Sequence, residues 1–148
     1  MGMDPLQFLV PLDWLAVVGP ALPFAILVMA LANVATRHRA HSKHVEQAAD
    51  GDSVDRYFPH VFTTVGLVLV SFLFTLVQPT GGAIISVVAA TVLLADVFEF
   101  EARNVEARNE LEIERPKSSI AASSIVVIYA IYYSLVALDA TFWSGLFA

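Results

Sequence analysis

The sequence contains no cysteine and only eight basic residues, of which two are lysine, Lys43 and Lys117. The lack of cysteine excludes disulfides, thiolate catalysis and cysteine-based metal centres. Neither lysine lies in an apolar block, which excludes a retinal Schiff base. The sequence also lacks a phosphate-cradling glycine loop, a Gly-x-Ser-x-Gly elbow and a His-Glu-x-x-His pair. We therefore expect no cofactor, no metal site and no nucleic-acid partner.

Hydrophobic residues make up 57% of the 148 positions, against roughly 45–50% in soluble domains. They gather in four blocks that predict membrane spans at about residues 14–36, 58–77, 82–100 and 119–139. The predicted fold is all-α, a four-transmembrane-helix bundle forming one membrane domain over residues 1–148. Soluble four-helix proteins carry a polar face on each helix, and the stretches 26–32 and 65–70 show none.

The first and fourth blocks have features typical of membrane spans, within them and beside them. Pro20 and Pro23 lie inside it, and proline in a membrane helix usually produces a kink. Residues 6–10 suit a short interfacial segment, and Phe142 with Trp143 suit an aromatic anchor after the fourth block. No basic residue precedes the first block, so we expect this span to be retained rather than cleaved.

The third block is apolar only from Ala83 to Ala95, a length of about 20 Å, which is too short to cross a bilayer. The helix must therefore continue through Asp96 and beyond. No glycine or proline interrupts it before Pro116. We predict one long third helix that extends into the cytoplasm.

All eight basic residues lie in two inter-span segments, 37–57 and 101–118. The positive-inside rule places such segments in the cytoplasm. The predicted protein is thus a multi-pass protein of the plasma membrane with both termini extracellular.

A polar layer is predicted where the helices meet the cytoplasm. Asp96 would lie about 22 Å along a roughly 30 Å hydrocarbon core, where a carboxylate is costly unless it is paired or protonated. Other helices bring polar groups to the same depth. The predicted members are Asp96, Glu99, Asn33, His60, Ser119 and Ser123. The layer is either a proton or cation site or a network that sets how the helices register, and we favour the network.

On the third helix, Asp96, Glu99, Arg103, Glu106 and Glu110 share one face by their spacing. Glu99 and Arg103 form an i,i+4 pair in the favourable order.

The segment after the first span is basic. We expect Arg37, Arg39 and Lys43 to contact lipid headgroups. His38, His41 and His44 recur every three residues, but the neighbouring cations argue against a metal there. Residues 47–55 are read as a flexible acidic linker.

The fourth block contains Tyr129, Tyr132 and Tyr133, whose simplest role is packing, with a ligand groove as the alternative. Thr64, Ser71 and Thr75 are possible hydrogen-bond partners for them.

The stretches 98–109 and 114–117 resemble a motif of small uncharacterised membrane proteins of haloarchaea, and residues 5–8 and the Pro20/Pro23 span are similar too. The resemblance covers nearly the whole chain. It implies an archaeal plasma membrane, which agrees with an acid-rich, lysine-poor composition, and it transfers no activity or catalytic residue.

The leading functional hypothesis is a small non-enzymatic membrane protein, namely an accessory, scaffold or oligomer-forming subunit. Its partners would be the lipid bilayer and another copy or another membrane protein. The alternative is a proton- or cation-coupled transporter or channel component using Asp96 and Glu99, which should show a water-accessible cavity reaching Asp96.

Overall fold

The computed structural model describes the chain over residues 12–147 and is all-helical there. A short helix α2 (Leu12–Val18) and a 3-10 turn η1 (Gly19–Ala21) lead into four long helices. These are α3 (Leu22–Ala49), α4 (Phe58–Val77), α5 (Pro79–Arg108) and α6 (Lys117–Phe147). By length and composition, four helices are able to cross a membrane. The predicted interfacial segment 6–10 and the side chains of Phe142 and Trp143 lie outside the described part.

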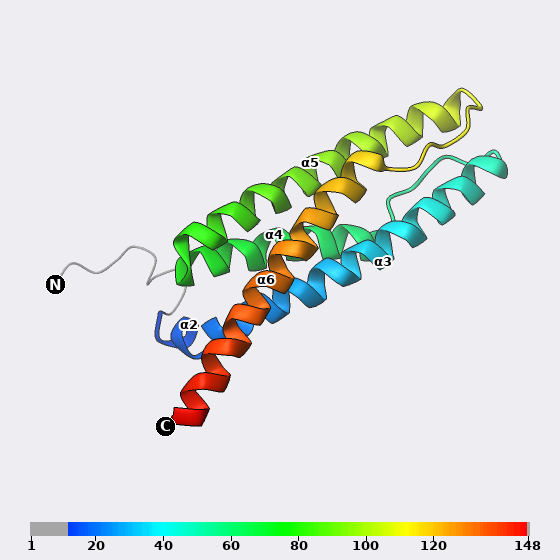
Figure 1. Cartoon of the computed structure of the whole chain (residues 1–148). Helices are drawn as coiled ribbons and strands as arrows, with labels where there is room; N and C mark the ends of the chain where they lie inside the picture. Colours follow the sequence, from blue (N-terminus) through cyan, green and yellow to red (C-terminus); the bar gives the residue numbers. More distant parts are fainter. Residues whose placement is uncertain (1–11, 148) are drawn as a thin grey trace, which may run out of the picture.

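The four long helices run up and down and close into a ring, in which α3 packs on α4, α4 on α5, α5 on α6 and α6 on α3 (Figure 1). The connections 50–57 and 109–116 lie at one end of this bundle, which we call the loop end. The helix α2 and the C-terminal part of α6 lie at the opposite end (Figure 1).

Prolines stand where a helix can accommodate them. Pro20 lies in the 3-10 turn, and Pro23, Pro59 and Pro79 lie in the first turns of α3, α4 and α5. A proline lacks a backbone N–H, and the first-turn N–H groups have no intrahelical partner in any case. The predicted first span is therefore two helices joined by a tight turn rather than one kinked helix.

The helices reach further into the loop end than the predicted boundaries. The segment 37–57, expected between two spans, is helical as far as Ala49, and 101–118 is helical as far as Arg108. The helix α5 is unbroken through Asp96, as the absence of glycine and proline after Gly82 predicts. Past Asp96, α5 projects about three further turns at 3.6 residues each.

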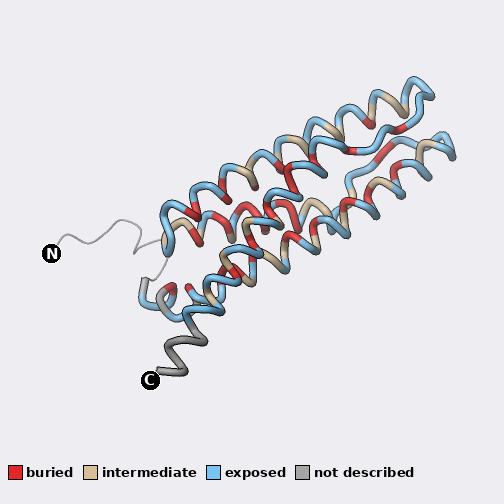
Figure 2. Tube along the Cα trace, in the orientation of Figure 1, coloured by how far each residue is buried: buried red, intermediate tan, exposed pale blue. Residues whose placement is uncertain are grey.

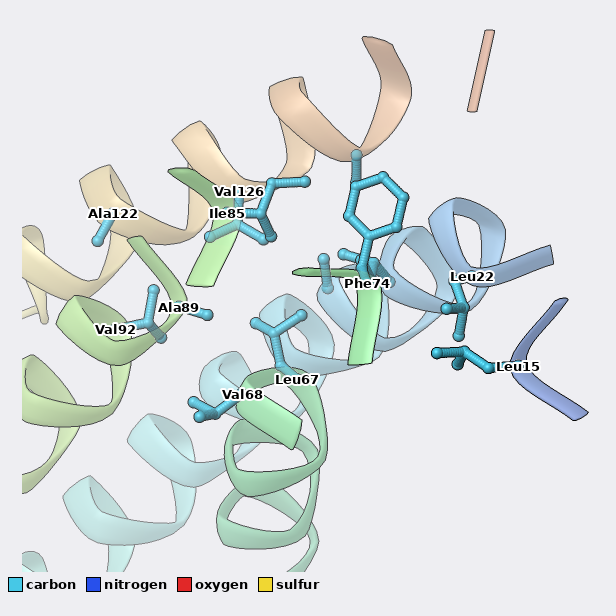
Figure 3. Packing of buried hydrophobic residues seen from close by; sticks show 13 residues of the cluster. Leu15, Leu22, Leu67, Val68, Phe74, Ile85, Ala89, Val92, Ala122 and Val126 are labelled. Carbon is cyan, nitrogen blue, oxygen red and sulfur yellow. The ribbon is translucent and has the colours of Figure 1, made fainter. Parts of the chain in front are cut away.

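The core is a column of aliphatic side chains contributed by all four helices. Ile26, Leu67, Ile85 and Val126 have no exposed surface and belong to one cluster (Figure 3). The buried residues concentrate on the faces that the helices turn to one another (Figure 2). Only 22–33% of the most apolar stretch of each helix is buried, so the rest of each stretch is partly or fully exposed.

A single residue, Gln78, separates α4 from α5. The close approach needs glycine, because a Cβ placed on Gly82 would overlap the backbone of Phe74 and Thr75. One on Gly81 would overlap the ring of Tyr133.

Candidate functional site: a polar clamp at the loop end

The carboxylate of Asp96 lies on α5 and is bonded from two other helices. Nη2 of Arg37, on α3, donates to both carboxylate oxygens at 3.1 Å. On α4, Nε2 of His60 lies 3.0 Å from Oδ2, and Oγ1 of Thr64 donates to the same oxygen at 3.0 Å. The side chains of Arg37 and Asp96 are only 5% and 14% exposed, so this is an ion pair removed from solvent.

The contacts define the tautomer of His60. An ionised carboxylate only accepts hydrogen bonds, so Nε2 of His60 must carry the hydrogen that faces Asp96. The other ring nitrogen, Nδ1, lies 3.0 Å from Oγ1 of Thr36. The imidazole therefore joins α3, α4 and α5.

Arg37 extends the network to the fourth helix. Its Nη1 donates to Oγ of Ser123 on α6, and its Nη2 also donates to Oδ1 of Asn33 at 2.9 Å. The amide nitrogen of Asn33 donates in turn to Oγ1 of Thr64 at 2.8 Å. We call this set the polar clamp; its members are Asn33, Arg37, His60, Thr64, Asp96 and Ser123.

Glu99, one turn further along α5, binds the start of α6. Its Oε1 accepts the backbone N–H of Ser119 at 3.1 Å, and its Oε2 accepts the Ser119 hydroxyl at 2.6 Å. The first N–H groups of a helix have no intrahelical partner, and a negative charge there also complements the helix dipole. Glu99 therefore caps α6 from a neighbouring helix.

Beyond the clamp, α3 and α5 are joined again by Arg103 and His44. Nη1 of Arg103 contacts Nδ1 of His44 at 3.0 Å, and because arginine only donates, Nδ1 must accept. Nε2 of His44 then carries the hydrogen and donates to the carbonyl of Asp55 at 2.7 Å. The guanidinium of Arg56 lies 4.3 Å from the ring centroid of Phe100, which also holds the connection 50–57 against α5.

Of the predicted layer, Asp96, Asn33, His60 and Ser123 come together in the clamp. Glu99 and Ser119 instead form the neighbouring cap. Glu99 binds Ser119 and Arg103 binds His44, and the charge of Glu99 still favours the charged form of Arg103, as the predicted i,i+4 pairing expects.

The prediction of lipid contact fails for Arg37, which is 4% exposed, whereas Arg39 and Lys43 are exposed. Its guanidinium faces inward because a buried Asp96 carboxylate needs a compensating charge.

Three hydroxyl residues were missed as members of this network: Thr36, Thr63 and Thr64. The sequence predicts Thr64 only as a hydrogen-bond partner of the tyrosines. A local signal was present, because Thr36 lies three positions after Asn33, while Thr63 and Thr64 lie three and four after His60. Such spacings put side chains on one helical face.

The histidines considered as metal ligands, the residues Ser71 and Thr75 of α4, and the tyrosines of α6 lie outside the clamp. Among the residues that the structure describes, no group of three acidic or histidine side chains could hold a metal ion. Ser71 and Thr75 donate to backbone carbonyls of α4. The ring of Tyr133 packs edge-on against Phe74, as the packing interpretation expects.

A small cavity of about 70 Å³ adjoins the clamp and is lined by Asp96, His60 and Thr64, with Tyr57 and Glu99. A buried water needs at least about 10–15 Å³ of such space, so the cavity has room for a few water molecules beside the carboxylate.

A family model described as Domain of unknown function (DUF7313) matches residues 4–147 of the chain. No curated protein and no solved structure matches it.

Proposed function

The chain belongs to this family of unknown function, and we propose from the geometry of the clamp that it is a non-enzymatic integral membrane protein, a scaffold or accessory subunit. The observation that carries the proposal is that polar and apolar side chains occupy different parts of the bundle. The polar side chains at the loop end are bonded to one another across all four helices, while large apolar side chains face outward on every helix.

The outward faces need an apolar solvent. Exposed large hydrophobic residues occur on each helix, for example Val28 (68%), Phe62 (67%), Val87 (67%) and Ile128 (65%). A water-soluble protein rarely exposes apolar surface on this scale. Lipid is the solvent that such faces fit, because a helix bonds its backbone polar groups internally except in its end turns.

The clamp supports a structural role at the loop end. Most of its donors and acceptors bond one another, several of them through charge-assisted contacts, and the charges of Arg37 and Asp96 cancel. A group engaged in this way is poorly placed to act on a substrate. It is well placed to fix the rotation of each helix relative to its neighbours.

The basic residues of the two loop-end segments support an orientation with this end in the cytoplasm and both termini outside. We propose the plasma membrane as the location. The acid-rich, lysine-poor composition supports a haloarchaeal source.

The absence of cysteine makes the topology simple to test, because single cysteines can be introduced without background labelling. Ser53→Cys and Glu112→Cys place a thiol in each loop-end connection, and Gln78→Cys places one in the opposite turn; all three positions are exposed. In intact cells, a membrane-impermeant maleimide should label only Gln78→Cys. Labelling of the two loop-end cysteines from opposite sides, or release of the protein by alkaline carbonate, refutes the proposal.

A second candidate, a proton-handling site, is favoured by the cavity beside Asp96 and His60. A metal or alkali cation fits less well, because the guanidinium of Arg37 already binds the Asp96 carboxylate and would repel a second cation there. A proton moving between water in this cavity and the His60–Asp96 pair is the transport chemistry that the contacts allow.

Reconstituted protein separates the two candidates. Vesicles containing the wild-type chain and an internal pH dye should show no more proton flux than empty vesicles under an imposed pH gradient. Flux that is present in the wild type and lost in Asp96→Asn would establish the second candidate and end the first. Mass measurement in mild detergent should show an assembly larger than one chain.

A further inference from the structure

A groove of about 600 Å³ lies between α3 and α6 at the loop end. We call it the α3–α6 groove; the argument uses Val34, Arg37, His38, His41, Arg115 and Ile120 of its lining. Its size falls within the roughly 300–1,000 Å³ of small-molecule sites. The groove is separate from the cavity beside Asp96, and Arg37 lines both.

The groove is basic in an acidic protein. Its lining includes two arginines and two histidines and no carboxylate, although the chain has a formal net charge of −6. Carboxylates gather instead in another groove, between α3 and α5, which is lined by Asp52, Glu101, Glu110 and Glu112. Because Asp96 balances Arg37, the positive potential that the α3–α6 groove presents to a ligand comes from Arg115.

Two buried polar atoms of the groove residues are without a hydrogen-bond partner. These are Nε of Arg37 and Nδ1 of His41, two of the three such side-chain atoms in the described residues. Buried polar groups are nearly always bonded, so these two atoms leave hydrogen-bonding capacity unsatisfied beside the groove.

The groove also has an apolar side. Val34 and Ile120, at 44% and 48% exposed, line it and face away from the core. Both lie on the parts of α3 and α6 that lead into the apolar stretches, so an acyl chain could follow the helices while a polar head stays in the groove.

We propose that the α3–α6 groove binds the phosphate of one anionic phospholipid, with Arg115 and His41 as its main contacts. This inference rests on the proposed membrane location. Because Asp96 already balances Arg37, Arg115 is the fixed cation left to face the phosphate. A guanidinium donates two parallel hydrogen bonds to phosphate oxygens, and the apolar wall selects a lipid over a free anion.

The test measures lipid retention by native mass spectrometry of delipidated protein, after addition of dioleoyl phosphatidylglycerol or dioleoyl phosphatidylcholine. The wild type should retain one phosphatidylglycerol and little phosphatidylcholine. Arg115→Gln, and its double variant with His41→Gln, should lower that retention about tenfold, as expected for losing a hydrogen bond to a charged group. The matched control is Arg108→Gln, an exposed arginine of the acidic groove, which should leave retention unchanged.

Three outcomes would overturn the inference. One is equal retention by wild type and Arg115→Gln. Another is equal retention of the two lipids. The third is displacement of the lipid by inorganic phosphate but not by sodium chloride of the same ionic strength, which assigns the groove to free phosphate. The cysteine labelling above reports the membrane location independently, so the two proposals fail separately.

Discussion

Arg37 of α3 and Asp96 of α5 lie 59 positions apart in the chain, yet one guanidinium nitrogen of Arg37 is 3.1 Å from both carboxylate oxygens of Asp96. Both side chains are largely buried, so each charge depends on the other. The same guanidinium reaches Asn33 and Ser123, so Arg37 contacts both α5 and α6 from α3.

Removing Arg37 should be costly. Arg37→Ala leaves Asp96 without its main counter-ion, and breaking a buried pair in this way costs about 3 kcal/mol or more. We expect a large drop in the midpoint of thermal unfolding in detergent. The control is Arg39→Ala, two positions away and exposed, which should change stability by no more than about 0.5 kcal/mol.

The charge dependence can be isolated with a second substitution. In an Asp96→Asn background, Arg37→Ala should cost less than in the wild type, because no carboxylate is left uncompensated. Equal costs in the two backgrounds would show that Arg37 contributes by packing alone.

Glu99→Ala should loosen the start of α6. The substitution removes both acceptors of Ser119, and loss of a helix cap costs about 1 kcal/mol. Hydrogen exchange of the peptide covering residues 117–122 should become faster, while that of α4 stays the same. Glu101→Ala, at an exposed neighbouring position, is the control. Unchanged exchange at the start of α6 in Glu99→Ala would refute the capping role.

Gly82→Ala should disrupt the α4–α5 turn. The added methyl group would overlap backbone atoms of α4, which cannot move without separating the two helices. Gly66→Ala is a matched control, since its methyl group would lie 3.1 Å from the flexible end of Met29. We expect Gly82→Ala to lower the unfolding midpoint well below that of Gly66→Ala. Similar midpoints for the two variants would mean that the helices can part at the turn at little cost.

His44→Ala should free the connection 50–57. Without the imidazole, the Asp55 carbonyl and the Arg103 guanidinium both lose a partner. Trypsin should then cut after Arg56 several-fold faster, because a protease cleaves a segment only when it detaches from the rest of the protein, and the connection 50–57 would detach more often. His38→Ala, at an exposed position on the same helix, should cleave at the wild-type rate. If His44→Ala is cut no faster, the contacts of Arg56 and Phe100 hold the connection without it.

The sequence by itself determined that the chain, over the residues that the structure describes, is all-helical with four helices long enough to cross a membrane, and that the third continues past Asp96. These properties are local. Apolar runs and the places of proline and glycine set where helices form, and the rise of about 1.5 Å per residue sets how far each reaches. The same rise per residue places Asp96, His60, Asn33 and Ser123 at one depth.

The tertiary structure alone decided which of these groups meet. Whether Arg37 turns to lipid or to Asp96 depends on the rotation of α3 against α5, and no local pattern encodes that rotation. Glu99 could satisfy Arg103 on its own helix or Ser119 on α6, and the second contact forms where α6 begins beside it. Contacts between residues distant in sequence follow from how whole helix faces pack. The depth of these groups and the His60–Asp96 contact could therefore be predicted, whereas the contacts of Arg37 and Glu99 could not.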